Sequence, residues 1–155
     1  MHHPFRRAIV GAVLTVASLA GMATEAGAAK PGDGGVTAPA CQSGDLMTLD
    51  VVASPATVTS GGRVTVSGAG RNCTVTTATV TVRKSATGPG GITSGCNIPA
   101  PTESQVTVAG GGTFSETQRF ATSRSASCTG TYTATVEVIY LGSVIGSDSA
   151  SFTVA

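Results

Sequence analysis

Apolar and polar residues alternate along the chain from residue 46 onward. A period of two is typical of strands that bury one face of a sheet. The alternation is strongest over residues 130–140, and no segment has the spacing of a helix. The pattern predicts about seven strands: Leu46–Ala53 with a short continuation at Ala56–Val58, Arg63–Ser67, Thr74–Lys84, Gln105–Ala109, Thr113–Ala121, Gly130–Tyr140 and Ser143–Val154.

Glycine-rich turns separate these segments. Residues 68–70 are predicted to end one strand, residues 110–112 to join their flanking strands in a hairpin, and Leu141-Gly142 to turn the chain. Residues 85–104 are predicted to be irregular. Short antiparallel strands joined in this way favour an all-β sandwich of two sheets. Its core is expected to contain the valine rows and five aromatic residues: Phe114, Phe120, Tyr132, Tyr140 and Phe152.

Residues 1–28 have the pattern of a secretory signal peptide. Arg6 and Arg7 precede a short apolar run, and Ala26-Gly27-Ala28 fits a small-residue cleavage site. The run has about 13 residues, whereas a membrane span needs about 20. We expect cleavage after Ala28 and a secreted, extracellular product without a membrane span. The paired arginines leave both the general and the twin-arginine export routes open.

Charge is sparse and balanced in the remaining sequence. Seven acidic and seven basic residues are scattered over residues 29–155 without runs. Such a surface offers no basic stripe for a phosphate backbone, so we expect no nucleic-acid partner. Thr, Ser, Val and Gly dominate instead, and Thr and Val suit a pleated surface. Composition therefore agrees with the strand pattern.

The sequence has four cysteines: Cys41, Cys73, Cys96 and Cys128. An even number in an exported protein predicts two disulfides. A zinc site is the alternative, but the cysteines lack C-x-x-C spacing and no His lies beyond residue 28.

Two segments resemble bacterial immunoglobulin-like domains. Residues 54–68, SPATVTSGGRVTVSG, are similar to the opening strands of that family, and residues 130–136, GTYTATV, to its sixth strand. The resemblance implies an immunoglobulin-like sandwich over residues 46–155. The preceding residues 29–45, rich in Gly, Ala and Pro, are expected from their composition to be a flexible segment. The resemblance also implies a tyrosine corner at Tyr132. From the positions of the cysteines in that strand order, it implies the pairs Cys41–Cys73 and Cys96–Cys128.

We find no combination of residues suited to catalysis. Without His there is no imidazole base for a Ser or Cys nucleophile. We interpret Lys30 and Lys84 as solvated charges, and Glu116 and Glu137 as strand-face charges rather than a glycosidase pair. No calcium loop or phosphate-binding loop is present. No catalytic residue, metal ligand or cofactor is therefore predicted.

Two features are candidate binding surfaces. The long segment 85–104 carries Ile92, Asn97 and Ile98, and long loops in compact domains are often functional. A neutral connection held by its cystine is the alternative. The segment from residue 29 to 43 is either a frayed leader or a strand that adds to another protein.

Three function classes remain open. We expect a non-enzymatic binding or adaptor module for an extracellular protein or cell-surface component, and an accessory subunit of a secreted toxin-type assembly is one form of it. The second is a small-molecule carrier, because residues 62–70 resemble the neocarzinostatin family of chromophore-binding apoproteins. That family, however, closes short local disulfide loops. The third is a secreted protease inhibitor that uses segment 85–104 as its reactive loop.

Overall fold

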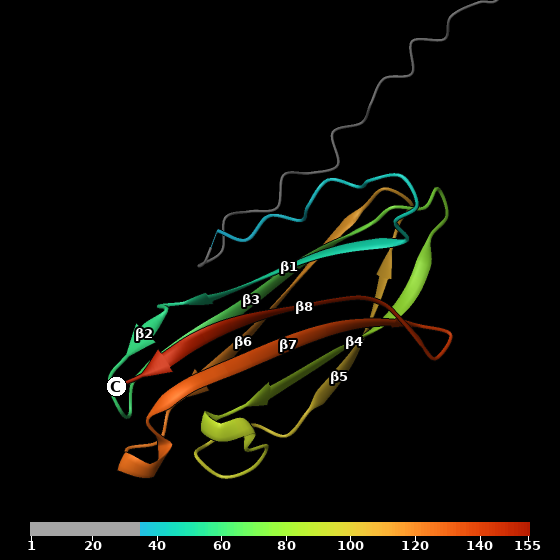
Figure 1. Ribbon diagram of the computed structural model, residues 1–155. Coiled ribbons are helices and arrows are strands. Elements are labelled where there is room, and N and C mark those ends of the chain that lie inside the picture. The colour runs from blue at the N-terminus through green and yellow to red at the C-terminus, as the bar shows by residue number, and fades with distance from the viewer. Residues whose placement is uncertain (1–34) are drawn as a thin grey trace, which may run out of the picture.

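The computed structural model describes residues 35–155, so the predicted signal peptide at 1–28 lies outside the described residues (Figure 1). The described part is all-β, with two sheets and two short 3-10 turns. No helix in residues 35–155 has the length and apolar character needed to span a membrane. The elements are β1 (Met47–Ser54), β2 (Thr57–Val58), β3 (Arg63–Asn72), β4 (Ala78–Thr87), η1 (Pro89–Gly91), β5 (Thr102–Val108), β6 (Thr113–Ala121), η2 (Ala126–Cys128), β7 (Gly130–Tyr140) and β8 (Ser143–Val154).

The strands form a three-stranded sheet, β1-β3-β6, and a five-stranded sheet, β2-β8-β7-β4-β5. Eight strands are found in residues 35–155 rather than seven, because β2 leaves the first sheet and pairs with β8 in the second. That pairing is parallel, whereas all strands were expected to be antiparallel. The other pairs are antiparallel.

The hairpin predicted across residues 110–112 does not form. β5 pairs with β4 in one sheet and β6 pairs with β3 in the other, so this turn links the two sheets. Both strands have inward-facing apolar positions, so each can pair with any strand that has the same alternation. Period-two alternation identifies a strand but does not specify its partner.

β3 continues past the glycines that were expected to end it. Gly68 and Gly70 face inward, where a Cβ on Gly68 would lie 3.6 Å from Val136 Cγ2 and one on Gly70 would overlap the Phe114 ring. The two glycines let the sheets approach each other and make room for the aromatic side chain. They are therefore part of the strand rather than a turn.

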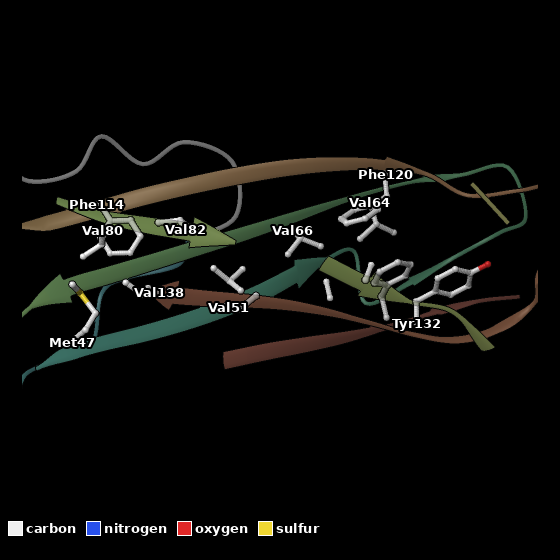
Figure 2. Packing of buried hydrophobic residues seen from close by; sticks show 14 of the residues in the cluster. Met47, Val51, Val64, Val66, Val80, Val82, Phe114, Phe120, Tyr132 and Val138 are labelled. Carbon is white, nitrogen blue, oxygen red and sulfur yellow. The ribbon is translucent and has the colours of Figure 1, made fainter. Parts of the chain in front are cut away.

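The core lies between the two sheets (Figure 2). Valines from β3, β4 and β7 fill its middle, and Tyr132 stacks on Phe152 with ring centroids 5.1 Å apart. Four of the five predicted core aromatics are buried, but Tyr140 is 41% exposed. A register shift between Val138 and Ile139 breaks the alternation before Tyr140. The buried cluster contains Met47, Val51, Val64, Val66, Val80, Val82, Ala86, Val108, Phe114, Phe120, Tyr132, Ala134, Val136, Val138, Phe152 and Val154.

Candidate functional site

Two disulfides tie the irregular segments to the sheets. Cys41 is bonded to Cys73, and Cys96 to Cys128, which is the pairing that the resemblance implied. The first holds the segment before β1 against the β3–β4 connection. The second joins the β4–β5 segment to η2 at the opposite end of the molecule (Figure 1).

The β4–β5 segment packs its apolar side chains on itself. A Cβ on the buried Gly88 would lie 2.8 Å from Ile98 Cδ1 and 3.0 Å from Ile92 Cγ1. Ile98 is partly buried against the core, and Ile92 is 38% exposed. Asn97 is exposed and adopts a positive φ of 60°. The three predicted binding residues thus lie close together, but their apolar surface is largely used within the segment.

A larger set of exposed apolar side chains lies at the opposite end of the sandwich. We call it the apolar end; it consists of Leu46, Val75, Tyr140, Leu141 and Val144. They come from the residue before β1, the β3–β4 connection and the β7–β8 hairpin. Ile92 is the remaining exposed large hydrophobic in residues 35–155. Single exposed apolar residues are normal on a protein surface, so the presence of five of them at one end makes this end a candidate interaction site.

The loops at this end are held by a buried asparagine. The Asn72 side chain donates to the carbonyls of Thr76, Val108 and Ala109, and its Oδ1 accepts from the Thr74 N–H and hydroxyl. The N–H of Gly111 also donates to the Thr74 carbonyl at 3.0 Å. The β3–β4 and β5–β6 turns therefore form one connected surface, from which Val75 projects at 97% exposure.

The turn between β7 and β8 has an unusual first residue. Leu141 and Gly142 both have positive φ, 48° and 82°, which is the pattern of a two-residue type I′ hairpin turn. Asn, Asp or Gly are preferred at the first position, because a left-handed backbone costs other L-residues roughly 1–2 kcal/mol. Leu141 is 87% exposed, so burial does not offset this cost.

A small hollow lies among these elements. Leu46, Tyr140 and Ile145 line it together with Met47, Ala78 and the side of the Asn72 loop. Its volume of about 100 Å³ is small beside the 300–1,000 Å³ typical of small-molecule sites. The hollow can therefore accept one side chain of a partner rather than a whole cofactor.

Lys84 and Glu116 were predicted to be solvated charges, but they form a partly buried ion pair. Lys84 does not point to solvent: its Nζ contacts Glu116 Oε2 at 2.8 Å, and both side chains are less than a quarter exposed. They follow the inward phase of β4 and β6, so the pair bridges the two sheets. Arg83 contacts Glu103 and Glu137 on the outer face, and the hydrogen bond with Glu103 raises the pKa of Arg83.

Residues 35–155 contain no group of three or more His, Cys, Asp or Glu side chains placed to hold a metal ion.

Sequence reasoning missed the apolar end. Two signals were available: a leucine where a tight hairpin turn favours asparagine, and a valine within the otherwise polar connection at 73–77. Neither signal shows without the structure that the two residues belong to the same end of the sandwich.

Comparison with known proteins gives a likeness of fold. No family model matches the sequence, and no curated protein matches it. A solved structure of Pseudomonas fluorescens alkylpurine DNA glycosylase AlkC, bound to DNA containing an abasic site analog, matches with a TM-score of 0.51 at 13% sequence identity. The match covers 72% of this protein and 31% of the glycosylase. At this identity the likeness concerns the fold alone.

Proposed function

We propose that the protein is a secreted, non-enzymatic binding module with an immunoglobulin-like sandwich, and that it recognises a protein partner through the apolar end. The partner belongs either to a secreted assembly, toxin-type assemblies included, or to a cell surface. The export pattern at residues 1–28 and the two disulfides support the extracellular setting.

Tyr132 supports the immunoglobulin-like assignment. Its buried hydroxyl donates a 2.7 Å hydrogen bond to the Cys128 carbonyl, four residues upstream, just before β7. This is the geometry of a tyrosine corner. The sheet orders β1-β3-β6 and β8-β7-β4-β5 are also compatible with that family.

Leu141 is the observation that carries the binding role. A large apolar side chain occupies a strained turn position, is almost fully exposed and lies at the same end as four other exposed apolar side chains. Stability alone favours asparagine at this position. A backbone cost that packing does not explain points to a function of the side chain. Complete burial of an exposed leucine side chain by a partner contributes about 1.5–3 kcal/mol.

A protein partner fits this surface better than a small molecule. The apolar side chains project from loops, and the hollow between them has only about 100 Å³. A chromophore carrier of the neocarzinostatin type needs a larger enclosed cleft. A protease inhibitor acting through the β4–β5 segment would need an extended exposed loop, whereas Ile92 and Ile98 fold back over Gly88.

A pull-down from culture medium with a matched control tests the proposal. The bait is the purified mature protein, compared with a Val75→Ser, Leu141→Ser double variant and with Ile92→Ser, which alters an exposed apolar residue at the other end. The double variant is expected to keep the wild-type thermal unfolding midpoint because its altered side chains are exposed, whereas Ile92→Ser needs only to remain folded, since Ile92 packs partly over Gly88. We expect wild type and Ile92→Ser to retain one protein that the double variant loses. Equal capture by all three would contradict the proposal.

A further inference from the structure

A second recess adjoins the apolar end on the outside of the smaller sheet. It has a volume of about 370 Å³ and lies between residues 38–41, the end of β3 and the β5–β6 turn. The Cys41–Cys73 disulfide and a 3.0 Å hydrogen bond from Thr48 Oγ1 to the Pro39 carbonyl hold the segment in place. The residues that line the recess are Ala38, Ala40, Cys41, Arg71, Asn72, Cys73 and Gly111.

Arg71 supplies the only charge in this lining. Its Nη1 makes one long hydrogen bond, 3.4 Å, to the Gly111 carbonyl. Its Nε is buried, and no group in residues 35–155 accepts a hydrogen bond from it. None of the three ion pairs in the described residues includes Arg71. The recess therefore contains a guanidinium that has no acidic partner among residues 35–155 and whose hydrogen bond to Gly111 is long.

A guanidinium without an acidic partner in the fold can bind an anion through its outer N–H groups. The planar guanidinium presents parallel N–H groups that match the two oxygens of a carboxylate. A single cation surrounded by alanine methyl groups and a disulfide favours a singly charged anion. A phosphate dianion would be left with a negative charge that no second cation balances.

We propose that the Arg71 recess binds a carboxylate of the protein partner that docks at the apolar end. This inference rests on the proposed function. Asn72 lines both the recess and the apolar hollow, so the two sites are adjacent. The partner thus carries a carboxylate beside the apolar side chains that cover Leu46 and Tyr140. Either an acidic side chain or the terminal carboxylate of the partner provides this group.

Small probes test the recess independently of the partner. The mature, disulfide-bonded protein, labelled with ¹⁵N, is titrated with N-acetyl-leucine, which has a terminal carboxylate, and with N-acetyl-aspartate amide, which has a side-chain carboxylate. N-acetyl-leucine amide and methyl phosphate serve as controls. We expect a saturable shift of the Arg71 Nε–Hε resonance with at least one carboxylate probe. The tighter of the two carboxylates identifies the source. No shift, or tighter binding of methyl phosphate, would overturn the assignment.

Three variants connect the binding to Arg71. Arg71→Gln is expected to weaken the better probe at least about tenfold, since hydrogen bonds to charged groups contribute about 1.5–3 kcal/mol. Arg71→Lys keeps the charge but loses the planar fork, so its affinity should lie between those of wild type and Arg71→Gln. Arg63→Gln, at an exposed position of the same strand, should bind like wild type. Unchanged affinity in Arg71→Lys would contradict the proposed geometry and does not depend on the folding of Arg71→Gln.

The two proposals can fail separately. If the probes bind as expected while the apolar double variant still captures its protein, the recess is real and the docking surface is wrong. If the double variant loses its protein but no probe shifts the Arg71 resonance, the docking surface remains and the carboxylate inference fails.

Discussion

The backbone N–H of Val51 donates a 2.8 Å hydrogen bond to the Asp148 carboxylate Oδ2. Val51 is in β1, at the edge of the smaller sheet, and Asp148 is in β8 of the larger sheet. A side chain thus supplies the acceptor that a neighbouring strand would otherwise provide. It also covers an edge that would be open to pairing with another polypeptide.

Removal of this acceptor is expected to destabilise the sandwich. Asp148→Ala leaves the partly buried Val51 N–H without a partner, so the free energy of unfolding should fall by about 1–3 kcal/mol. Asp148→Asn retains an oxygen acceptor and should lose less. Urea unfolding of the three proteins measures both values. A loss in Asp148→Asn equal to that in Asp148→Ala would show that the hydrogen bond is not the stabilising element.

The Lys84–Glu116 pair should stabilise the fold more than a surface ion pair does. Its side chains are only 16% and 22% exposed, and Ser104 Oγ donates to the same carboxylate at 3.4 Å. We expect Glu116→Gln to reduce the free energy of unfolding by about 1–2 kcal/mol, between the values for exposed and fully buried pairs. Arg83→Gln, which breaks the two ion pairs on the exposed outer face, should lower the free energy of unfolding less than Glu116→Gln does. Equal losses in urea unfolding would contradict this difference.

Leu141→Asn should separate stability from binding. Asparagine tolerates the positive φ of this position, so the variant should gain up to about 1 kcal/mol in the free energy of unfolding. The same change removes the most strained residue of the apolar end and should abolish capture of the partner. Calorimetry and the pull-down measure the two effects. A destabilised variant, or one that still captures the partner, would remove the argument based on Leu141.

We predict that ionisation of Tyr132 lowers the stability of the protein at alkaline pH. Burial raises the pKa of Tyr132 above its ordinary value of 10.0. The folded protein therefore keeps the phenol proton in a pH range where the unfolded protein releases it. The contribution of Tyr132 is constant below pH 10.0 and decreases as the pH rises above that value toward the folded-state pKa.

Tyr132→Phe tests this linkage. It should lower the free energy of unfolding near neutral pH by about 1 kcal/mol through loss of the hydrogen bond to Cys128. It should also flatten the decrease at alkaline pH. Urea unfolding over a series of alkaline pH values provides the comparison. An identical alkaline slope in both proteins would show that Tyr132 does not cause it.

Most strands could be predicted because their inward positions carry valine. Val80 and Val82 in β4, and the long alternation of β7, identify these two strands and the face of each that is buried. Strand partners could not be predicted in the same way. β5 and β6 follow each other across three glycines, yet they belong to different sheets, and only tertiary packing decides between these arrangements.

The candidate site depended on information that a local pattern does not contain. Leu46 and Tyr140 are 94 positions apart in the sequence and line the same hollow. Arg71 looks like an ordinary strand-face charge until the Cys41–Cys73 disulfide places residues 38–41 beside it. Likewise, Lys84 follows two inward valines in β4, but its ion pair needs the glutamate of another sheet.

The position of β8 has a consequence for how the protein is made. This strand, the last of the described residues, lies inside the larger sheet between β2 and β7, and its residue Val154 is 1% exposed. During synthesis from the N-terminus, the larger sheet therefore has a missing interior strand until residues 143–154 become available. The larger sheet is therefore completed only after the whole of β8 has been made. A tag fused after Ala155 would lie next to β8, and we expect it to disturb completion of the larger sheet more than a tag placed ahead of residue 35.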